Sequence, residues 1–222
     1  MKFHRSAKYT LHVGLFTGTR FTSGWDNTGW GIADAQKNLA FKALYFAAAP
    51  IAGVEAQYGG LYIIRGESTE LTTYDEDGYV VGGRVSVRRP KQFYFDELSA
   101  TIGYLAPDSR EIPISRRTKY LNDTPNYRHF LVDKKFGKRA GLSTDFTYAA
   151  GAKTWREAIN LKTPELHVVD TVVFENYQRV NRTADRGFAA TLDKALNRKV
   201  SMNWGYASID PQYGALNADR FH

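Results

Sequence analysis

The stretch YDEDGYVVGGRVSVRRPKQFYFDELSATIGYL (residues 74–105) decides the fold class, because its apolar and polar residues alternate one by one. The first strand that it predicts has one face with Tyr79, Val81, Val85 and Val87, and another with Gly82, Arg84, Ser86 and Arg88. On the second predicted strand, Leu98, Ala100, Ile102 and Tyr104 oppose Glu97, Ser99, Thr101 and Gly103. A period of two residues is typical of a β-strand with one apolar and one polar face. The acidic turn at residues 74–78 and the break at residues 89–91 predict antiparallel hairpins.

The same alternation recurs along most of the chain. It predicts further strands within residues 11–21, 39–45, 54–62, 127–133, 140–148, 168–178, 188–192 and 200–206. Residues 154–161 fit either a short helix or a strand. Turns are predicted at Ala49-Pro50 and at residues 134–138 and 197–199, and the polar stretch 107–126 predicts a long exposed loop. We therefore expect an all-β fold: one domain over residues 1–222, built as an antiparallel up-and-down meander of about ten strands.

The length and chemistry of these strands favour an outer-membrane-type β-barrel, or part of one. Many of them run to roughly eight to twelve residues, whereas strands of soluble domains have about five or six and transmembrane strands about nine to eleven. Their polar faces carry small residues and charges, as the wall of a wet lumen does. In the segment 39–45, the apolar face is assigned to Leu39, Phe41, Ala43 and Tyr45. The alternative is a soluble antiparallel sheet with one solvated face, which also alternates.

The composition fits a β-barrel and excludes several other classes. The 14 Tyr and 4 Trp suit positions with one wet and one apolar end. There is no Cys, so no disulfide or thiolate metal site forms, and no apolar run reaches the roughly 18 residues of a transmembrane helix. The net charge of +7 favours acidic partners such as anionic lipid or lipopolysaccharide. The basic residues are spread along the chain, which argues against nucleic acid.

Four strings carry a resemblance to a known class of proteins. They are FKALYFAAAPIAGVEAQYGG (41–60), residues 74–105, LKTPELHVVDTVVFENYQRV (161–180) and WGYASIDPQYGALNADRF (204–221). They resemble the porin-like and alginate-export-like outer-membrane barrels predicted in Acidobacteria-type genomes. The resemblance implies a bacterial outer-membrane location in a Gram-negative cell, a lipid-bilayer environment, and passive or export-type transport of small solutes. It implies neither a cofactor nor an enzymatic activity.

Two departures from such barrels concern the ends of the chain. The start, MKFHRSAK (residues 1–8), has the charge of a signal-peptide n-region but lacks the apolar segment that should follow. Residues 216–222 read as a polar loop rather than a closing strand that ends in an aromatic residue. We expect the chain to be the interior part of a longer barrel, since an open barrel leaves strand edges unpaired.

The candidate site is the set of charged residues on the polar strand faces. Placed inside a barrel, cations facing acids narrow the pore and bias which solutes pass. The predicted pore-lining residues are Arg65, Arg84, Arg88, Arg139, Glu55, Glu97, Asp145 and Glu175. The simpler interpretation is that these are ordinary solvated charges of a sheet. With the net charge at +7, a lumen of this kind would prefer anions or acidic sugars modestly over cations.

Other functions stay open at this level. Trp204 and Tyr206 could stack on sugars in a secreted carbohydrate-binding sheet, and a β-sheet lyase acting on acidic polysaccharide is a third alternative. The acids Glu55, Asp96, Glu97, Asp145 and Glu175 could pair for glycoside chemistry, although acids opposite Arg across a lumen are the favoured interpretation. The five His are scattered, without the spacing of a metal site, and residues 75–78 fit a turn better than a calcium loop.

Overall fold

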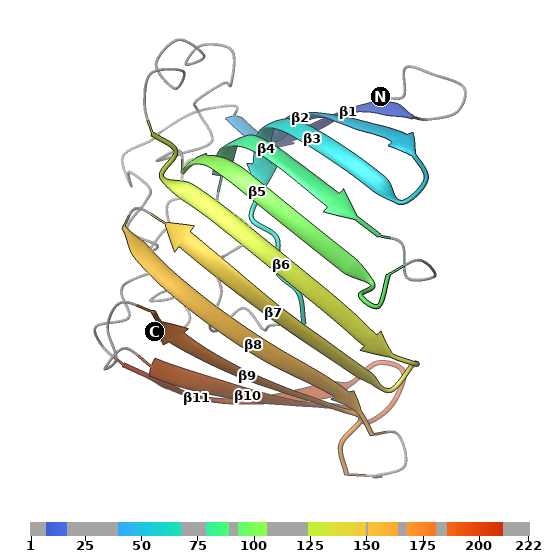
Figure 1. Cartoon of the computed structure of the whole chain (residues 1–222). Helices are drawn as coiled ribbons and strands as arrows, with labels where there is room; N and C mark the ends of the chain where they lie inside the picture. The colour runs from blue at the N-terminus through green and yellow to red at the C-terminus, as the bar shows by residue number, and fades with distance from the viewer. Residues whose placement is uncertain are drawn as a thin grey trace.

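The computed structural model describes residues 8–16, 40–67, 79–88, 93–105, 124–149, 151–163, 168–180 and 186–210. These residues form one antiparallel sheet of eleven strands in sequence order (Figure 1). The first six strands are β1 (Tyr9–Phe16), β2 (Ala40–Ile51), β3 (Val54–Tyr62), β4 (Tyr79–Val87), β5 (Glu97–Leu105) and β6 (Tyr127–Phe136). The others are β7 (Ala140–Ala149), β8 (Ala152–Lys162), β9 (Thr171–Arg179), β10 (Arg186–Ala195) and β11 (Ser201–Ile209). The described residues contain no helix, and hence none long and apolar enough to cross a membrane.

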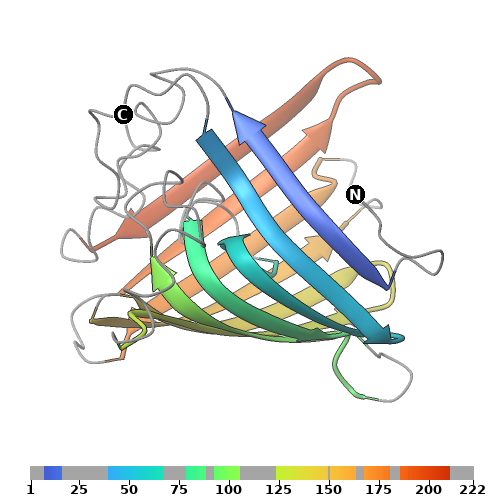
Figure 2. The same cartoon turned by 90° about the horizontal axis from the view of Figure 1, so that it is seen from above.

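The predicted all-β meander is confirmed, and the undecided segment 154–161 is strand β8, which makes the count eleven rather than about ten. The sheet curls strongly (Figure 2) but is not closed into a barrel, because β1 and β11 each have one neighbour among the described strands. Since strands alternate in direction along the meander, β1 and β11 run the same way. A direct pairing of these two edges would therefore be parallel.

Two predicted turns were misplaced. Strand β2 continues through Pro50, and the chain turns at Ala52-Gly53 instead. Proline has no N–H for the ladder, and the register between β2 and β3 shifts in this stretch, which is how a strand accommodates proline. Strand β6 likewise continues to Phe136, and the turn lies at residues 137–139, where Gly137 has a φ of 64°. The predicted turn at residues 197–199 is where β10 joins β11. The acidic turn at 74–78 and the terminal stretch 216–222 lie outside the described residues, as does most of the predicted loop 107–126.

The curled sheet has a concave face and a convex face with opposite chemistry. On β5, Ser99 and Thr101 are buried on the concave face, whereas Ile102 is 51% exposed on the convex face. The alternation predicted for residues 74–105 therefore assigns these faces correctly. It was wrong in β2, where Ala43, Tyr45 and Ala47 share the concave side and Phe46 is exposed. A shift in the β1–β2 register between Gly14 and Leu15 breaks the simple alternation there.

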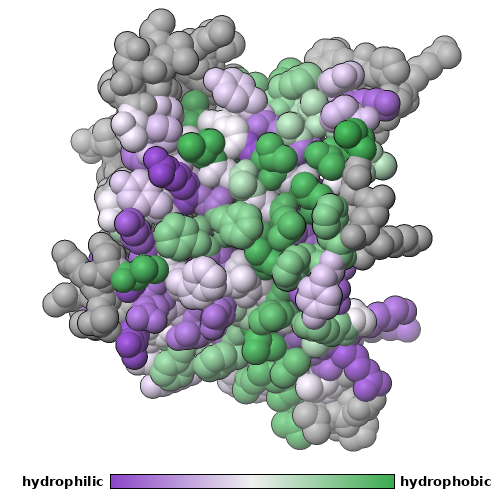
Figure 3. Space-filling model, viewed as in Figure 1, coloured by the Kyte–Doolittle hydropathy of each residue, from purple (hydrophilic) through white to green (hydrophobic). Residues whose placement is uncertain are grey.

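The two ends of the sheet also differ. We call the "turn end" the end where β2–β3, β4–β5, β6–β7, β8–β9 and β10–β11 connect, on the right of Figure 1. The opposite "loop end" holds the three longest connections, residues 17–39, 63–78 and 106–126. Figure 3 shows apolar residues gathered in a band across the convex face, with more hydrophilic residues toward the loop end.

Candidate functional site: the polar concave face

The centre of the concave face is a buried ion pair between neighbouring strands. The β7–β8 register places Asp145 opposite Arg156. Arg156 Nη2 donates to Asp145 Oδ1 at 2.6 Å, and Arg156 Nε lies 3.0 and 3.1 Å from the two carboxylate oxygens. Thr147 is a second partner of Asp145, with its hydroxyl 3.1 Å from Asp145 Oδ1. The two charged side chains are no more than 2% exposed, so their geometry is held away from solvent.

A histidine lies beside this pair on β6. His129 Nε2 is 3.7 Å from Asp145 Oδ1, too far for a hydrogen bond. Neither ring nitrogen of His129 has a hydrogen-bond partner within the part of the chain that the structure describes. The Asp145 carboxylate already accepts hydrogen bonds from Arg156 and Thr147. It is therefore not available as a free base.

Arg84 on β4 forms the second buried polar group. Its Nε donates to Thr101 Oγ1 at 3.0 Å and its Nη1 to Gln57 Oε1 at 3.2 Å. Its Nη2 donates to the backbone carbonyl of Tyr62. All three acceptors are neutral. The positive charge of Arg84 is therefore solvated by the wall itself, in a position that is only 6% exposed.

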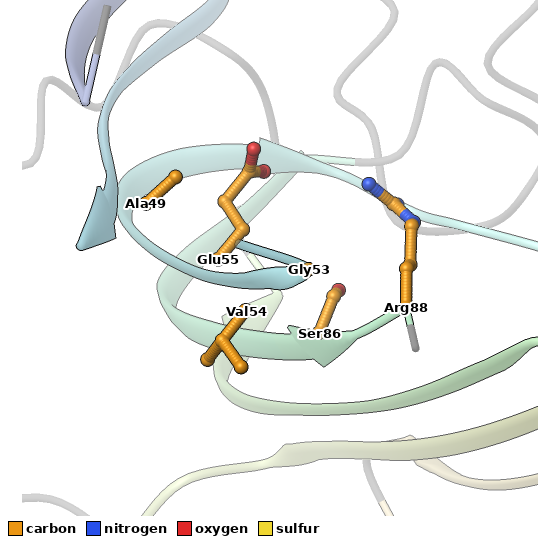
Figure 4. A pocket seen from close by; sticks show the side chains of 6 residues that line it. All are labelled: Ala49, Gly53, Val54, Glu55, Ser86 and Arg88. Atoms are coloured by element: carbon orange, nitrogen blue, oxygen red, sulfur yellow. The ribbon is translucent and has the colours of Figure 1, made fainter. Parts of the chain in front are cut away.

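The turn end of the concave face carries a second ion pair and a small hollow. Arg88, directly after β4, binds Glu97 with two parallel bonds, Nε–Oε2 at 2.8 Å and Nη2–Oε1 at 2.9 Å. Glu55 and Arg88 point to the same side of the strands, while Val54 points to the other (Figure 4). The hollow is lined by Ala49, Gly53, Val54, Glu55, Ser86 and Arg88.

A segment that follows β3 covers part of this face from inside. Residues 63–67 run behind β6 and β7 in Figure 1, and Glu67 N donates to Ser143 Oγ at 2.8 Å. A Cβ at Gly66 would lie 2.4 Å from Ser143 Cβ, and one at Gly141 would lie 2.7 Å from the carboxylate of Glu67. Glycine at both positions therefore permits the close approach. We call residues 63–67 the inner segment.

An apolar contact anchors the start of the inner segment. Ile63 packs in one buried cluster with Val80, Tyr127 and Ala149, from β4, β6 and β7. Together with the bond from Glu67 to Ser143, this contact fixes both ends of the inner segment on the concave face. The wall behind it is shielded from water, which helps to explain why its polar side chains are buried.

The predicted pore-lining residues lie in four different places. Arg84, Asp145 and Glu175 are buried on the concave face. Glu55, Glu97 and Arg88 lie together near the turn end, and Arg65 belongs to the inner segment. Arg139 is exposed in the β6–β7 turn, outside β7, because the strand begins at Ala140. The structure thus does not bring Arg139 to the wall beside Asp145.

Sequence reasoning missed Arg156, the partner of Asp145. The signal was present in the segment left undecided between helix and strand. Read as a strand, it alternates Thr154, Arg156 and Ala158 with the outward residues Trp155, Glu157 and Ile159. That alternation alone puts Arg156 on the polar face, although only the register identifies Asp145 as its partner.

The described residues contain no group of three His, Cys, Asp or Glu arranged to hold a metal ion. The described concave face carries paired charges and hydroxyl groups, most of them buried. No protein-family model, curated protein or solved structure matches this chain.

Proposed function

We propose that this chain forms the wall of a transmembrane β-barrel in a bacterial outer membrane, which lets small polar solutes pass. The observation that carries the proposal is the inverted polarity of the two faces. Arg156, Asp145 and Glu175 are at most 2% exposed on the concave face, whereas the convex face exposes Phe130 at 49% and Phe174 at 46%. Large apolar side chains exposed in this number are unfavourable in water and favourable against lipid.

Strand length and connection length support the same reading. The described strands have between 8 and 12 residues, close to the span that a tilted strand needs to cross a bilayer. Outer-membrane barrels have short periplasmic turns and longer extracellular loops. In this proposal, the turn end faces the periplasm and the loop end faces the outside of the cell.

An antiparallel closure of the barrel requires strands beyond the eleven that the structure describes. Because β1 and β11 run in the same direction, an antiparallel closure needs an odd number of additional strands between them. The unpaired edges have to be satisfied, since hydrocarbon offers no hydrogen bonds to a free strand edge. Bacterial single-chain barrels with an even strand count meet this condition.

The wall suggests only modest charge selectivity. The Arg156–Asp145 and Arg88–Glu97 pairs cancel most of their own charge. Arg84 binds neutral acceptors, and the whole chain has a net charge of +7, so we propose a weak preference for anionic solutes or acidic sugars. The inner segment narrows the passage on the side of β6 and β7.

Planar-bilayer recording of the complete barrel tests this function. We expect stepwise conductance and a reversal potential that indicates weak anion preference under a salt gradient. Arg84→Ala should shift the reversal potential toward cations, because it removes a charge that no acid pairs in the described wall. Arg88→Ala should also shift it toward cations, because it leaves the Glu97 carboxylate without its cation. Absence of conductance would contradict the proposal, and a cation-selective parent would contradict its account of the charges.

A second candidate is a carbohydrate-binding sheet, and one observation favours it. Phe174, Phe188 and Tyr206 form a row of ring contacts on the convex face, with centroids 6.1 and 5.8 Å apart. Trp204 is 45% exposed beside this row. Such a platform can stack on sugar rings. Binding on a glycan array that is lost in Trp204→Ala, by a protein soluble without detergent, would favour this candidate over the channel.

A further inference from the structure

A row of three residues crosses the convex face at the loop end. The registers place Arg128 of β6 opposite Tyr148 of β7, and Tyr148 opposite Lys153 of β8. Along their strands these residues alternate with buried ones: Tyr127 and His129 flank Arg128, and Thr147 and Ala149 flank Tyr148. The three side chains therefore project outward together.

The row holds two cations on either side of an aromatic ring. The guanidinium carbon of Arg128 lies 5.9 Å from the centroid of the Tyr148 ring. Neighbouring strands are about 5 Å apart, and Lys153 lies opposite Tyr148 on the strand across from Arg128. Stacking on the ring orients the guanidinium and leaves its N–H groups free for a ligand.

No acid competes for these two cations among the described convex residues of the three strands. One step deeper along the same strands lie Phe130, Phe146 and Trp155, which are not ionisable. The carboxylate of Glu157 lies four residues beyond Lys153, about 13 Å along the strand. Its Oε1 accepts the indole N–H of Trp155 at 3.0 Å. Neither Arg128 nor Lys153 has a described ion pair that would neutralise it.

We propose that Arg128, Tyr148 and Lys153 form a binding site for the phosphate group of a lipopolysaccharide-type lipid in the outer leaflet. The assignment rests on the proposed membrane function. The cations lie at the loop end, and the aromatic residues directly below them offer a surface for acyl chains. A guanidinium fork matches phosphate oxygens with two parallel bonds, and an adjacent ammonium adds a second charge. The ligand is therefore an amphiphile with a phosphorylated head.

The test measures lipid A binding to the complete protein in a neutral detergent, by native mass spectrometry. The probes are diphosphoryl lipid A, the same lipid without its phosphates, and inorganic phosphate. We expect the parent to retain diphosphoryl lipid A and to bind the dephosphorylated lipid much more weakly. Removing both cations in Arg128→Ala/Lys153→Ala should weaken binding by about tenfold or more.

The control variant Arg198→Ala/Lys199→Ala removes the same charge from the β10–β11 turn at the opposite end. It should bind lipid A as the parent does, and an equal loss there would overturn the site in favour of general charge attraction. Inorganic phosphate that displaces lipid A at similar concentration would overturn the lipid assignment. Circular dichroism checks folding, and Arg128→Gln/Lys153→Gln repeats the test with longer side chains if the alanine variant fails to fold.

The outcomes separate this site from the proposed function. A parent that conducts in bilayers but does not retain diphosphoryl lipid A overturns the site alone. A parent that is soluble and monodisperse without detergent overturns the membrane proposal and with it the lipid site.

Discussion

The central strands β6–β8 and the edge strand β11 share one alternating sequence pattern but differ in burial. In β7 and in residues 154–158 of β8, every second residue is buried, including Asp145, Thr147 and Arg156. In β11, the residues that belong to the concave face by register, Asn203 and Gly205, are exposed like their outward neighbours. Both regions alternate polar and apolar residues, but only the central strands bury their polar residues.

Burial of the polar face therefore depends on the curvature of the sheet and on neighbouring strands, not on alternation itself. Asp145 and Arg156 have a strand on each side, and the inner segment reaches the wall at Ser143 on the same strand as Asp145. Strand β11 has one described neighbour, β10. A polar face becomes a structural interior only where the curled sheet encloses it.

We expect the largest loss of unfolding free energy when the buried Arg156–Asp145 pair is disrupted. Asp145→Ala removes the carboxylate that binds Arg156 in a buried position, which costs about 3–5 kcal/mol of unfolding free energy. Arg156→Met/Asp145→Leu replaces both charges by apolar groups and should be far less damaging than either single change. Urea unfolding of the folded protein in detergent or lipid vesicles measures all three.

Asn203→Ala on β11 is the matched change at the edge. Asn203 donates to Asp193 from an exposed position, so its loss should cost no more than about 1 kcal/mol. Equal costs at the centre and the edge would contradict the comparison.

The second prediction concerns the stability effect of a charge placed on the convex face of β5 or β6. Ile102→Arg puts a charge into the apolar band and should cost about 2–4 kcal/mol if this face contacts hydrocarbon. Phe136→Arg, at the turn end of β6, should cost only about 0–1 kcal/mol, because charges near the membrane interface are tolerated. In a soluble sheet both changes would stay within about 0.5 kcal/mol. Unfolding in lipid vesicles decides between these outcomes.

Alternation predicted the class of fold and the polarity of most strands from local sequence. It assigned β5 correctly because nothing interrupts the period between Leu98 and Tyr104. It failed in β2, where a shift in the β1–β2 register changes which residues face inward. Such shifts depend on the neighbouring strand and leave no mark in the period of a single strand.

The site was less accessible to prediction for the same reason. Asp145 was found because it stands among small polar residues on one face, but its partner Arg156 depends on register between strands. The inner segment could not be predicted, since Glu67 and Ser143 are joined only through the folded arrangement. The glycines at positions 66 and 141 are needed there, yet their role is visible only once the segment is in place.

We expect the smallest change in stability from substitutions of Asp96 and Asp170, which lie at the turn end outside the strands. Asp96 accepts a hydrogen bond from the backbone N–H of Lys135 at 2.7 Å, which together with the charge of Lys134 lowers the pKa of its carboxyl. Asp170 binds Lys194 Nζ at 2.8 Å and the backbone N–H of Ala195 at 2.7 Å, and these bonds lower its pKa as well. The folded protein therefore favours the ionised forms of the Asp96 and Asp170 carboxyl groups more than the unfolded chain does.

The sign of the pH dependence follows from those lowered pKa values. The two carboxylates contribute stability above the unfolded Asp pKa of about 3.9. This contribution disappears as the pH falls through the lower pKa of the folded state. Asp96→Asn/Asp170→Asn should therefore be slightly less stable than the parent at neutral pH and equal to it in strong acid. Unfolding midpoints from neutral to acid pH measure this difference, and a difference that does not shrink in acid would contradict the assignment.

We propose that the convex face contacts lipid and that the concave face does not. The chain has no Cys, so a single spin label can be attached through Phe146→Cys on the convex face or Thr147→Cys on the concave face. Collision with dissolved oxygen, which concentrates in lipid, and with a water-soluble nickel complex is then measured in vesicles containing the complete protein. The account predicts strong oxygen and weak nickel collision at position 146, and weak oxygen collision at position 147. Nickel collision at position 146 as strong as at an exposed turn would contradict it.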